Sequence, residues 1–142
     1  MNDESDIPVE KTEAFVSALK LVSRAEQCGA MLTRKLRQRG YSGKDAAAAI
    51  EKLEENGLLD DSRFARLWLQ SRIARKTENP RKLAAGLLAK GINERIVRAA
   101  LKETLPTETE FTLLTRYINE TGISERAALR ACGFSAESLE ML

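Results

Sequence analysis

The residues in this chain best able to do chemistry are arginines and lysines, which gather in two clusters. The first cluster contains Arg34, Lys35, Arg37 and Arg39. The second contains Arg72, Arg75, Lys76, Arg81 and Lys82, and Lys90 follows it. The planar fork of arginine pairs with a phosphate or a carboxylate through two parallel hydrogen bonds. Both clusters are therefore candidate sites for an anionic partner.

Arg81 and Lys82 follow Asn79-Pro80, a pair that is typical of a helix start because asparagine caps a helix and proline fits its first position. The first backbone N–H groups of a helix have no partner within it and carry the positive end of its dipole. We expect these groups to point outward beside Arg81 and Lys82 and to favour a phosphate or carboxylate there.

The distribution of charge also favours an anionic partner, although the net charge is only +2. Residues 1–19 carry one Lys against five acids, residues 20–98 carry eighteen Lys or Arg against nine acids, and residues 99–142 carry four against seven. A basic middle between acidic ends favours a polyanionic or acidic partner for the middle. The alternative is that these charges form ordinary solvated helix faces.

The sequence has few residues of the types that form catalytic or metal sites. It has no histidine, the commonest general base, and its two cysteines, Cys28 and Cys132, lie far apart. We expect both thiols to be buried and inert, and we expect no catalytic residues, metal or cofactor. Asp60 and Asp61 are interpreted as capping residues of the helix that follows them. Trp68, the only tryptophan, is a core anchor or a partly exposed interface anchor.

The composition favours helices, because Ala and Leu dominate the 43% of hydrophobic residues and aromatic residues make up only 5%. No apolar run approaches the roughly 18 residues that span a bilayer. The first ten residues are polar and acidic, unlike a signal peptide. We therefore expect an all-α protein of the cytoplasm with no membrane segment.

A short sequence motif that occurs three times predicts how the helices are joined. It reads leucine, three residues, glycine, a bulky apolar residue and a capping residue, at Leu36–Ser42, Leu87–Asn93 and Leu129–Ser135. Glycine ends a helix in the left-handed conformation, the apolar residue folds back, and the Ser or Asn caps the next helix. The spacings of 51 and 42 residues between these joints indicate a helical repeat.

Helical periodicity between the joints predicts three tandem three-helix, helix-turn-helix-like repeats in an elongated or curved arrangement. We expect a flexible acidic arm over residues 1–10, repeats over residues 11–57 and 58–106, and an abbreviated repeat over residues 107–142. The predicted core stripes include Phe15, Ala18, Leu19 and Val22 in the first helix, and Leu83, Leu87 and Leu88 after Asn79. Thr107 and Glu110 match a capping box, and Ser124 is expected to open the helix after Gly122.

Such three-helix units also occur in sequence-specific DNA readers. Here the recognition helix would be Ser42–Asn56, which contains four consecutive alanines and no Asn, Gln or Arg in its early turns to bind base edges. Sequence-specific reading is therefore disfavoured, whereas non-specific phosphate contact stays open.

Several motifs follow one another in a distinctive order. They are Leu19-x-Leu21-Val22-Ser23-Arg24, Leu32-(x)3-Leu36-(x)2-Arg39-Gly40-Tyr41-Ser42, Leu53-(x)3-Gly57-Leu58-Leu59-Asp60-Asp61-x-Arg63-Phe64-Ala65, Ser71-Arg72 and Leu87-(x)2-Lys90-Gly91-Ile92. In order and spacing these motifs resemble the bacterial RecX family over about residues 14–105, most specifically at Gly57–Ala65. The chain departs from the family pattern at Ala25-Glu26-Gln27, where Arg-Glu-His is common, and at Met31 and Gly86, where glutamate is common.

The resemblance implies a non-enzymatic, all-helical regulator that binds the RecA recombinase or its filament on DNA. It implies modulation, usually inhibition, of RecA in DNA recombination, DNA repair and the SOS response. The basic middle would then meet acidic RecA surface and the DNA of the filament, and we expect a monomer. One alternative is a non-specific nucleic-acid-binding helical repeat that acts without RecA. Another is an adaptor that docks through the alanine-rich segment Asp45–Leu53.

Overall fold

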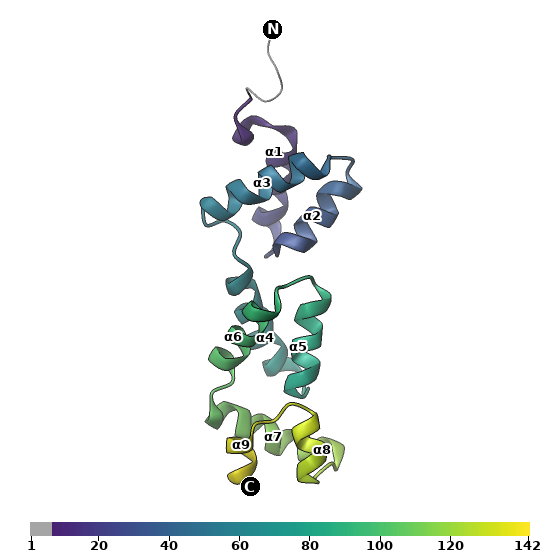
Figure 1. The fold of residues 1–142 in the computed structure, drawn as a ribbon, viewed down its shortest axis with the longest axis vertical. Helices are drawn as coiled ribbons and strands as arrows, with labels where there is room; N and C mark the ends of the chain where they lie inside the picture. The colour runs from purple at the N-terminus through teal and green to yellow at the C-terminus, as the bar shows by residue number, and fades with distance from the viewer. Residues whose placement is uncertain (1–6) are drawn as a thin grey trace. The chain divides into compact units, whose positions relative to one another are not determined.

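The computed structural model describes residues 7–142, and every regular element in that range is a helix (Figure 1). The elements are the 3-10 turn η2 (Val9–Lys11) and the helices α1 (Glu13–Arg24), α2 (Gly29–Gln38), α3 (Gly43–Glu55), α4 (Asp61–Arg75), α5 (Pro80–Ala89), α6 (Glu94–Thr104), α7 (Thr107–Thr121), α8 (Arg126–Ala131) and α9 (Ala136–Glu140). The prediction of an all-α fold is confirmed. Most of the predicted acidic arm, residues 1–6, lies outside the described residues.

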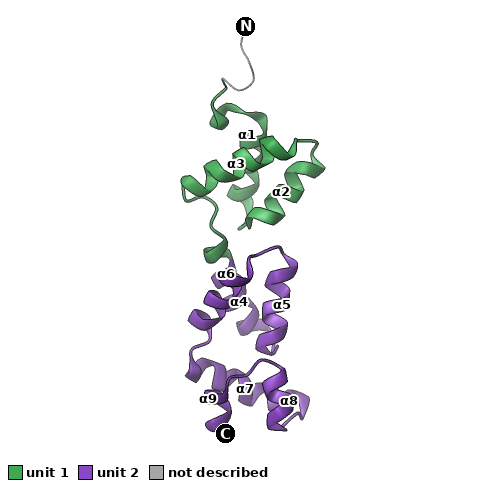
Figure 2. Cartoon of the chain, in the orientation of Figure 1, with its two compact units in different colours: residues 1–64 green, residues 65–142 purple. Residues whose placement is uncertain are grey.

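The chain forms two compact units, residues 1–64 and residues 65–142 (Figure 2). The boundary falls within α4, so the first unit ends with the opening turn of that helix. The second unit contains the rest of α4 and the helices α5 to α9. None of the described helices is long and apolar enough to cross a membrane.

The core of the first unit is built from one face each of α1, α2 and α3. Its buried residues are Ala14, Phe15, Ala18, Leu21, Leu32, Leu36, Ala46, Ala49, Leu53 and Leu59. The small side chains of Ala46 and Ala49, both fully buried, let α3 approach α1 closely. The predicted stripe of α1 was wrong at Leu19, which is 39% exposed, because the helix turns Leu21 into the core instead.

The second unit buries apolar residues from α4 to α9. They are Ala65, Leu69, Leu83, Leu87, Ile92, Val97, Ala100, Leu105, Leu113, Leu114, Tyr117, Leu129, Phe134 and Leu139. Leu88, expected on the core stripe of α5, is 45% exposed. It follows Leu87 directly, and successive helix positions point about 100° apart. In α5 the helix therefore turns Leu87 into the core and leaves Leu88 toward solvent.

The three predicted joints are confirmed. Gly40, Gly91 and Gly133 have positive φ angles of 94°, 87° and 98°. After each glycine, the N–H of the apolar residue donates to the carbonyl of the first leucine of the motif. The N···O distances are 3.2 Å from Tyr41 to Leu36, 3.3 Å from Ile92 to Leu87 and 3.2 Å from Phe134 to Leu129. Ser42, Asn93 and Ser135 then cap the next helix through their side chains. This is the Schellman type of helix ending.

Two predicted helix caps in the last third of the chain were wrong, although α7 begins at Thr107 as predicted. Thr107 is already inside α7, and its partner in the expected capping box, Glu110, instead accepts the N–H of Ser135 at 2.5 Å. This contact ties α7 to the start of α9. Residue Ser124 does not open α8, which begins at Arg126 after Glu125 and has no side-chain cap. The expected capping box with Thr107 does not form because the carboxylate of Glu110 binds the N–H of Ser135, 25 residues away.

Candidate functional site

The first basic cluster lies on α2, and most of its side chains are already held by neighbouring groups. Lys35 donates to Gln27 Oε1 at 2.9 Å, Arg37 donates to the carbonyl of Tyr41 at 3.2 Å, and Arg39 donates to Ser17 Oγ at 2.9 Å. Arg34 is exposed and makes no hydrogen bond or ion pair with any described residue. It is therefore the cation of this cluster with the greatest freedom to meet a partner.

A hollow of about 340 Å³ lies beside Arg39 in the first unit. It is lined by Lys11, Glu13, Val16, Ser17, Lys20, Arg39 and Tyr41. Three cations and one acid face it, so the surroundings favour an anion. The sequence did not indicate this hollow, because Ser17 and Arg39 are 22 residues apart and meet only when α1 packs beside the end of α2.

The second cluster is organised by a carboxylate that the sequence analysis missed. Glu78 is only 7% exposed, and it accepts a hydrogen bond from Arg72 Nε at 2.5 Å. Lys82 Nζ lies 3.8 Å from its other oxygen. The hydrogen bond from Arg72 holds the pKa of Glu78 below its usual value, against the opposing effect of burial, and the charges of Arg72, Lys82 and Lys76 add to it. Glu78 thus neutralises part of the cluster and fixes its geometry.

Arg72 is held from two sides. Its guanidinium carbon lies 5.1 Å from the centre of the Trp68 ring, a cation–π contact, while Glu78 binds Nε. The two Nη groups make no hydrogen bond with the described residues and remain available to an anion. Trp68, half-buried, is the platform for this guanidinium. A Cβ atom at Gly86 would lie 2.6 Å from Trp68 Cη2, so the glycine makes room for the ring.

The first backbone N–H groups of α5 do not point outward as predicted. The N–H of Arg81 donates to the carbonyl of Cys132 at 3.0 Å, and the N–H of Lys82 donates to Asn79 Oδ1 at 2.8 Å. The Arg81 guanidinium also donates to the carbonyl of Ala131 at 3.1 Å. The C-terminal end of α8 therefore occupies the N-terminal end of α5, where opposite ends of two helix dipoles meet. The prediction of free N–H groups at Arg81 and Lys82 was wrong, whereas contact of these two side chains with an anionic partner stays a prediction.

The remaining cations of the second cluster differ in exposure. Arg75 and Lys76 are exposed at the end of α4, where Arg75 Nε donates to the carbonyl of Ser71 at 3.3 Å. Lys90 is half-buried and follows the last residue of α5. Arg72, Arg75 and Lys76 thus lie near one another toward the end of α4, and Lys82 is exposed at the start of α5.

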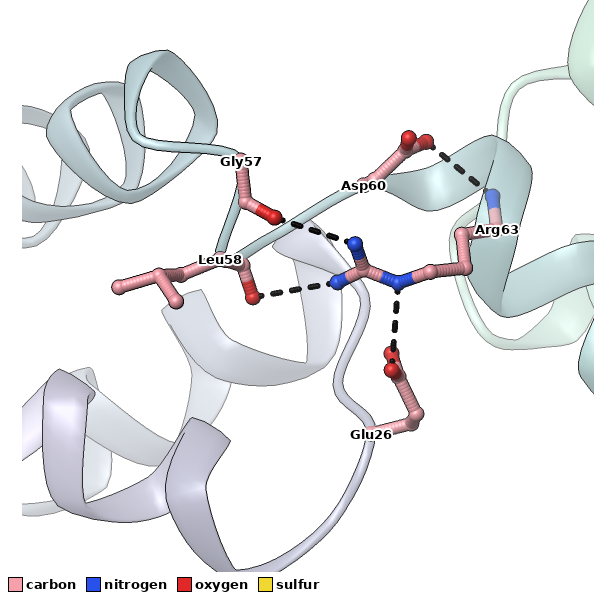
Figure 3. A network of polar contacts seen from close by, with 5 residues as sticks. All are labelled: Glu26, Gly57, Leu58, Asp60 and Arg63. Carbon is pink, nitrogen blue, oxygen red and sulfur yellow. Dashed lines mark hydrogen bonds and ion pairs between the residues drawn. The ribbon is translucent and has the colours of Figure 1, made fainter.

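The motif Gly57–Ala65 has a structural task that is visible in Figure 3. Arg63 donates to the carbonyls of Gly57 at 3.1 Å and Leu58 at 3.3 Å, and its Nε donates to Glu26 Oε1 at 3.2 Å. Asp60 caps α4 by accepting the N–H of Arg63 at 3.1 Å, as predicted. This Arg63 bridge fixes the segment between α3 and α4 against the loop between α1 and α2.

Asp61, the second aspartate of the motif, also forms a hydrogen bond within the fold. Asp61 accepts the N–H of Gly29, the first residue of α2, at 2.8 Å. Neither aspartate is part of a metal site, and no group of three or more His, Cys, Asp or Glu is placed to hold a metal ion in the described part of the chain. Of the two cysteines, Cys28 is buried as expected, but Cys132 is half-buried, with Sγ 3.6 Å from the Tyr117 hydroxyl.

Comparison with known proteins identifies this arrangement. A family model of the first three-helix domain of RecX matches residues 14–53, and one of the second three-helix domain matches residues 60–101. Regulatory protein RecX of Thermus thermophilus is 39% identical over 106 residues, which are 75% of this chain and 72% of that protein. Regulatory protein RecX of a Mycobacterium species, strain JLS, is 33% identical over 101 residues, which are 71% of this chain but only 55% of that protein.

Solved structures share the fold. A crystal structure of regulatory protein RecX matches with a TM-score of 0.71 at 22% identity, over 91% of this chain and 69% of the other. The crystal structure of RecX from Lactobacillus salivarius matches with a TM-score of 0.69 at 21% identity, over 91% of both chains. With two RecX domain matches and a relative of 39% identity, the chain belongs to the RecX family of regulatory proteins.

Proposed function

We propose that this chain binds the RecA recombinase or its filament on DNA and inhibits RecA's ATP hydrolysis and strand exchange in DNA recombination and repair. The observation that best supports the proposal is the position of the two basic clusters. The first lies within the segment that matches the first RecX domain, and the second lies within the segment that matches the second. The surfaces most suited to an anionic partner thus coincide with the parts of the chain that define its family.

We assign contact with RecA or DNA to the cations whose charged groups are least engaged by the chain itself. Arg34, Arg75 and Lys76 are exposed, and Arg72 offers two Nη groups on a fixed guanidinium. Carboxylates of RecA and phosphates of the DNA in its filament are both bound well by such groups. Lys35, Arg39 and Arg81 donate to groups of the chain itself, and we assign them a supporting role.

Inhibition would follow from attachment at more than one place. Two basic clusters on one chain raise the effective concentration of the second once the first has bound. A filament held at two places resists the rearrangements that accompany ATP turnover. This action requires no cofactor and no catalytic residue from the chain.

The test is RecA's ATP hydrolysis, stimulated by single-stranded DNA and measured while the chain is added to RecA from the same organism. We expect a dose-dependent fall in the rate that reaches a plateau. The triple variant Arg72→Glu, Arg75→Glu and Lys76→Glu should require about tenfold more protein for the same effect. Arg126→Glu is the matched control, because Arg126 is also exposed but lies on α8, outside both clusters. An unchanged rate at saturating amounts of the wild-type chain contradicts the proposal.

A further inference from the structure

The surface of α1 carries two aliphatic side chains that the first unit leaves uncovered. Val16 is 41% exposed and Leu19 is 39% exposed. They lie three positions apart, so they are neighbours on the same side of the helix. Phe15 and Ala18 are the residues of these turns that face the core. Val16 and Leu19 therefore form an aliphatic step that is open to a partner.

The hollow beside Arg39 adjoins this aliphatic step, because Val16 is also part of its lining. Its three cations, Lys11, Lys20 and Arg39, are exposed and form no ion pair with the described residues. The buried Ser17 accepts Arg39 Nη1 at 2.9 Å, whereas Nε and Nη2 have no hydrogen-bond partner in the described part of the chain. The fork of Arg39 is thus oriented by the fold and still able to bind an anion.

The acids near this hollow neutralise only part of its charge. Glu13 is the one acid in the lining. Glu10, on the preceding turn η2, lies 2.8 Å from Lys52 Nζ and is engaged by α3. The three acids of residues 1–6 lie outside the described residues. Three cations against one acid give the lining a net positive charge, so its ligand is an anion.

The aliphatic step distinguishes between the possible anions. A nucleic acid strand would use the cations, but its backbone is polar and its bases stack best on aromatic side chains. Tyr41, the aromatic residue of the lining, is half-buried and packs against the core of the first unit. A protein segment with an acid beside an aliphatic residue uses both features, because covering exposed aliphatic surface is favourable. The juxtaposition of the hollow and the step therefore favours a protein partner.

We propose that the hollow and the aliphatic step together bind a protein segment in which an aspartate or glutamate lies beside an aliphatic residue. The carboxylate binds the fork of Arg39 in the hollow that Lys11 and Lys20 also line, and the aliphatic side chain covers Val16 and Leu19. That the segment belongs to RecA rests on the proposed function, whereas the docking surface itself does not.

The docking surface can be tested on the chain alone with the capped dipeptide acetyl-Glu-Leu-amide, which has one carboxylate and one aliphatic side chain. It is added at constant ionic strength while the backbone ¹H–¹⁵N NMR signals are followed. We expect the signals of Val16, Ser17 and Tyr41 to shift and saturate. Acetyl-Gln-Leu-amide, which lacks the charge, should bind about fivefold more weakly. Failure of these signals to saturate with acetyl-Glu-Leu-amide overturns the inference.

Two double variants show which features of the surface the dipeptide uses. Lys11→Gln with Lys20→Gln removes two exposed charges that pair with no described residue, and should weaken binding about fivefold. Val16→Thr with Leu19→Gln removes aliphatic surface at exposed positions, and should weaken binding about threefold. Because all four positions are exposed, both double variants should keep the wild-type fold, which their NMR spectra report.

Matched controls and a second probe separate this surface from a phosphate site. Lys102→Gln and Leu88→Gln, at exposed positions of the second unit, should bind the dipeptide as wild type does. The second probe is inorganic phosphate. If phosphate saturates the same signals at lower concentration than the dipeptide, and Val16→Thr with Leu19→Gln binds the dipeptide as well as wild type, the hollow is a phosphate site and the inference is wrong.

The same variants extend the test to RecA. Each double variant should lower the affinity of the chain for a RecA filament by about the factor found with the dipeptide, and the controls should not. If the dipeptide saturates but neither double variant changes filament binding, the docking surface stands, RecA is not its partner, and the proposed function is untouched. If the wild-type chain does not bind the filament, the proposed function is wrong, and the dipeptide titration alone decides the docking surface.

Discussion

Arg72 donates from Nε to the carboxylate of Glu78 at 2.5 Å, and this places a buried acid at the centre of the second basic cluster. With Nε bound and the plane resting on Trp68, the guanidinium has a fixed orientation before any partner arrives. A fixed side chain loses less conformational entropy on binding than a mobile one. Glu78 is thus a positioning residue for the cation that faces the partner.

Replacing Glu78 tests this relationship through stability. Glu78→Gln keeps the shape of the side chain but removes its charge, so we expect the free energy of unfolding at pH 7 to fall by about 1–3 kcal/mol. The pKa of Glu78 is lowered in the folded state, so its stabilisation is present above its unfolded value, near 4.3, and is lost as the pH falls through the folded value. Urea unfolding, followed by the fluorescence of Trp68 in the second unit, measures the free energy of unfolding at neutral and at acid pH.

The contrast between wild type and Glu78→Gln should therefore disappear once the pH lies below the lowered pKa of Glu78 in the folded state. A loss of equal size at neutral and acid pH would show that the charge of Glu78 contributes nothing. Lys102→Gln serves as the control because that side chain is exposed, makes no ion pair within 4 Å in the described chain and does not act on the pKa of Glu78. Its effect should stay within about 0.5 kcal/mol.

Gly86 should resist a substitution that ordinarily stabilises a helix. Alanine in place of glycine in a helix interior gains about 1 kcal/mol, but here the new Cβ would lie 2.6 Å from Trp68 Cη2 and 3.0 Å from Cζ2. The ring must move, so we expect no gain in stability and a shift in Trp68 emission. Ala85→Gly, at the neighbouring position, is the control for helix propensity and should lose about 1 kcal/mol. A stabilised Gly86→Ala with unchanged emission would refute the role of this contact.

Gly133 combines a positive φ with close contact, and Gly122 separates the two effects. Both glycines have positive φ angles, 98° and 76°, so alanine at either position meets backbone strain of about 1–2 kcal/mol. A Cβ at Gly133 would also lie 2.9 Å from the backbone nitrogen of Arg81, whereas nothing lies within 4 Å at Gly122. Gly133→Ala should therefore lose clearly more stability than Gly122→Ala in urea unfolding. Equal losses would mean that the docking of α8 on α5 tolerates the extra atom.

The Arg63 bridge needs the fork of arginine and not only its charge. Arg63→Lys retains the charge but cannot reach the carbonyls of Gly57 and Leu58 and the carboxylate of Glu26 together, so we expect a loss of roughly 1–2 kcal/mol. Arg66→Lys is the matched control on the same helix, because its contact with Glu103 is a single exposed pair at 3.9 Å. Circular dichroism during urea unfolding measures both. Similar losses for the two variants would remove the special role of Arg63.

The features that could be predicted from the sequence are those set by residues close together in the chain. The joints at Gly40, Gly91 and Gly133 depend on about seven residues each, so the backbone geometry follows from local chemistry. The caps at Asp60 and Asn79 are local in the same sense.

What the sequence did not indicate depends on residues brought together by packing. The N–H of Arg81 donates to the carbonyl of Cys132, which is 51 positions away in the sequence, so this N–H at the start of α5 does not face an anion. Arg116 donates a hydrogen bond to Ile73, which is 43 positions away in the sequence, and both residues line a hollow that no sequence motif predicts. Glu78 lies close in sequence to Arg72, but only the turn between α4 and α5 places its carboxylate against Nε.

The measurement that tests the central claim most directly is the binding of the chain, labelled at its N-terminus, to RecA filaments on single-stranded DNA, compared with the same DNA without RecA. At moderate salt we predict saturable binding to the filament and little binding to DNA alone, with a loss of about tenfold for Arg72→Glu, Arg75→Glu and Lys76→Glu but not for Arg126→Glu. Equal binding to bare DNA that weakens steeply as salt rises would contradict the claim and identify a nucleic-acid-binding protein that acts without RecA.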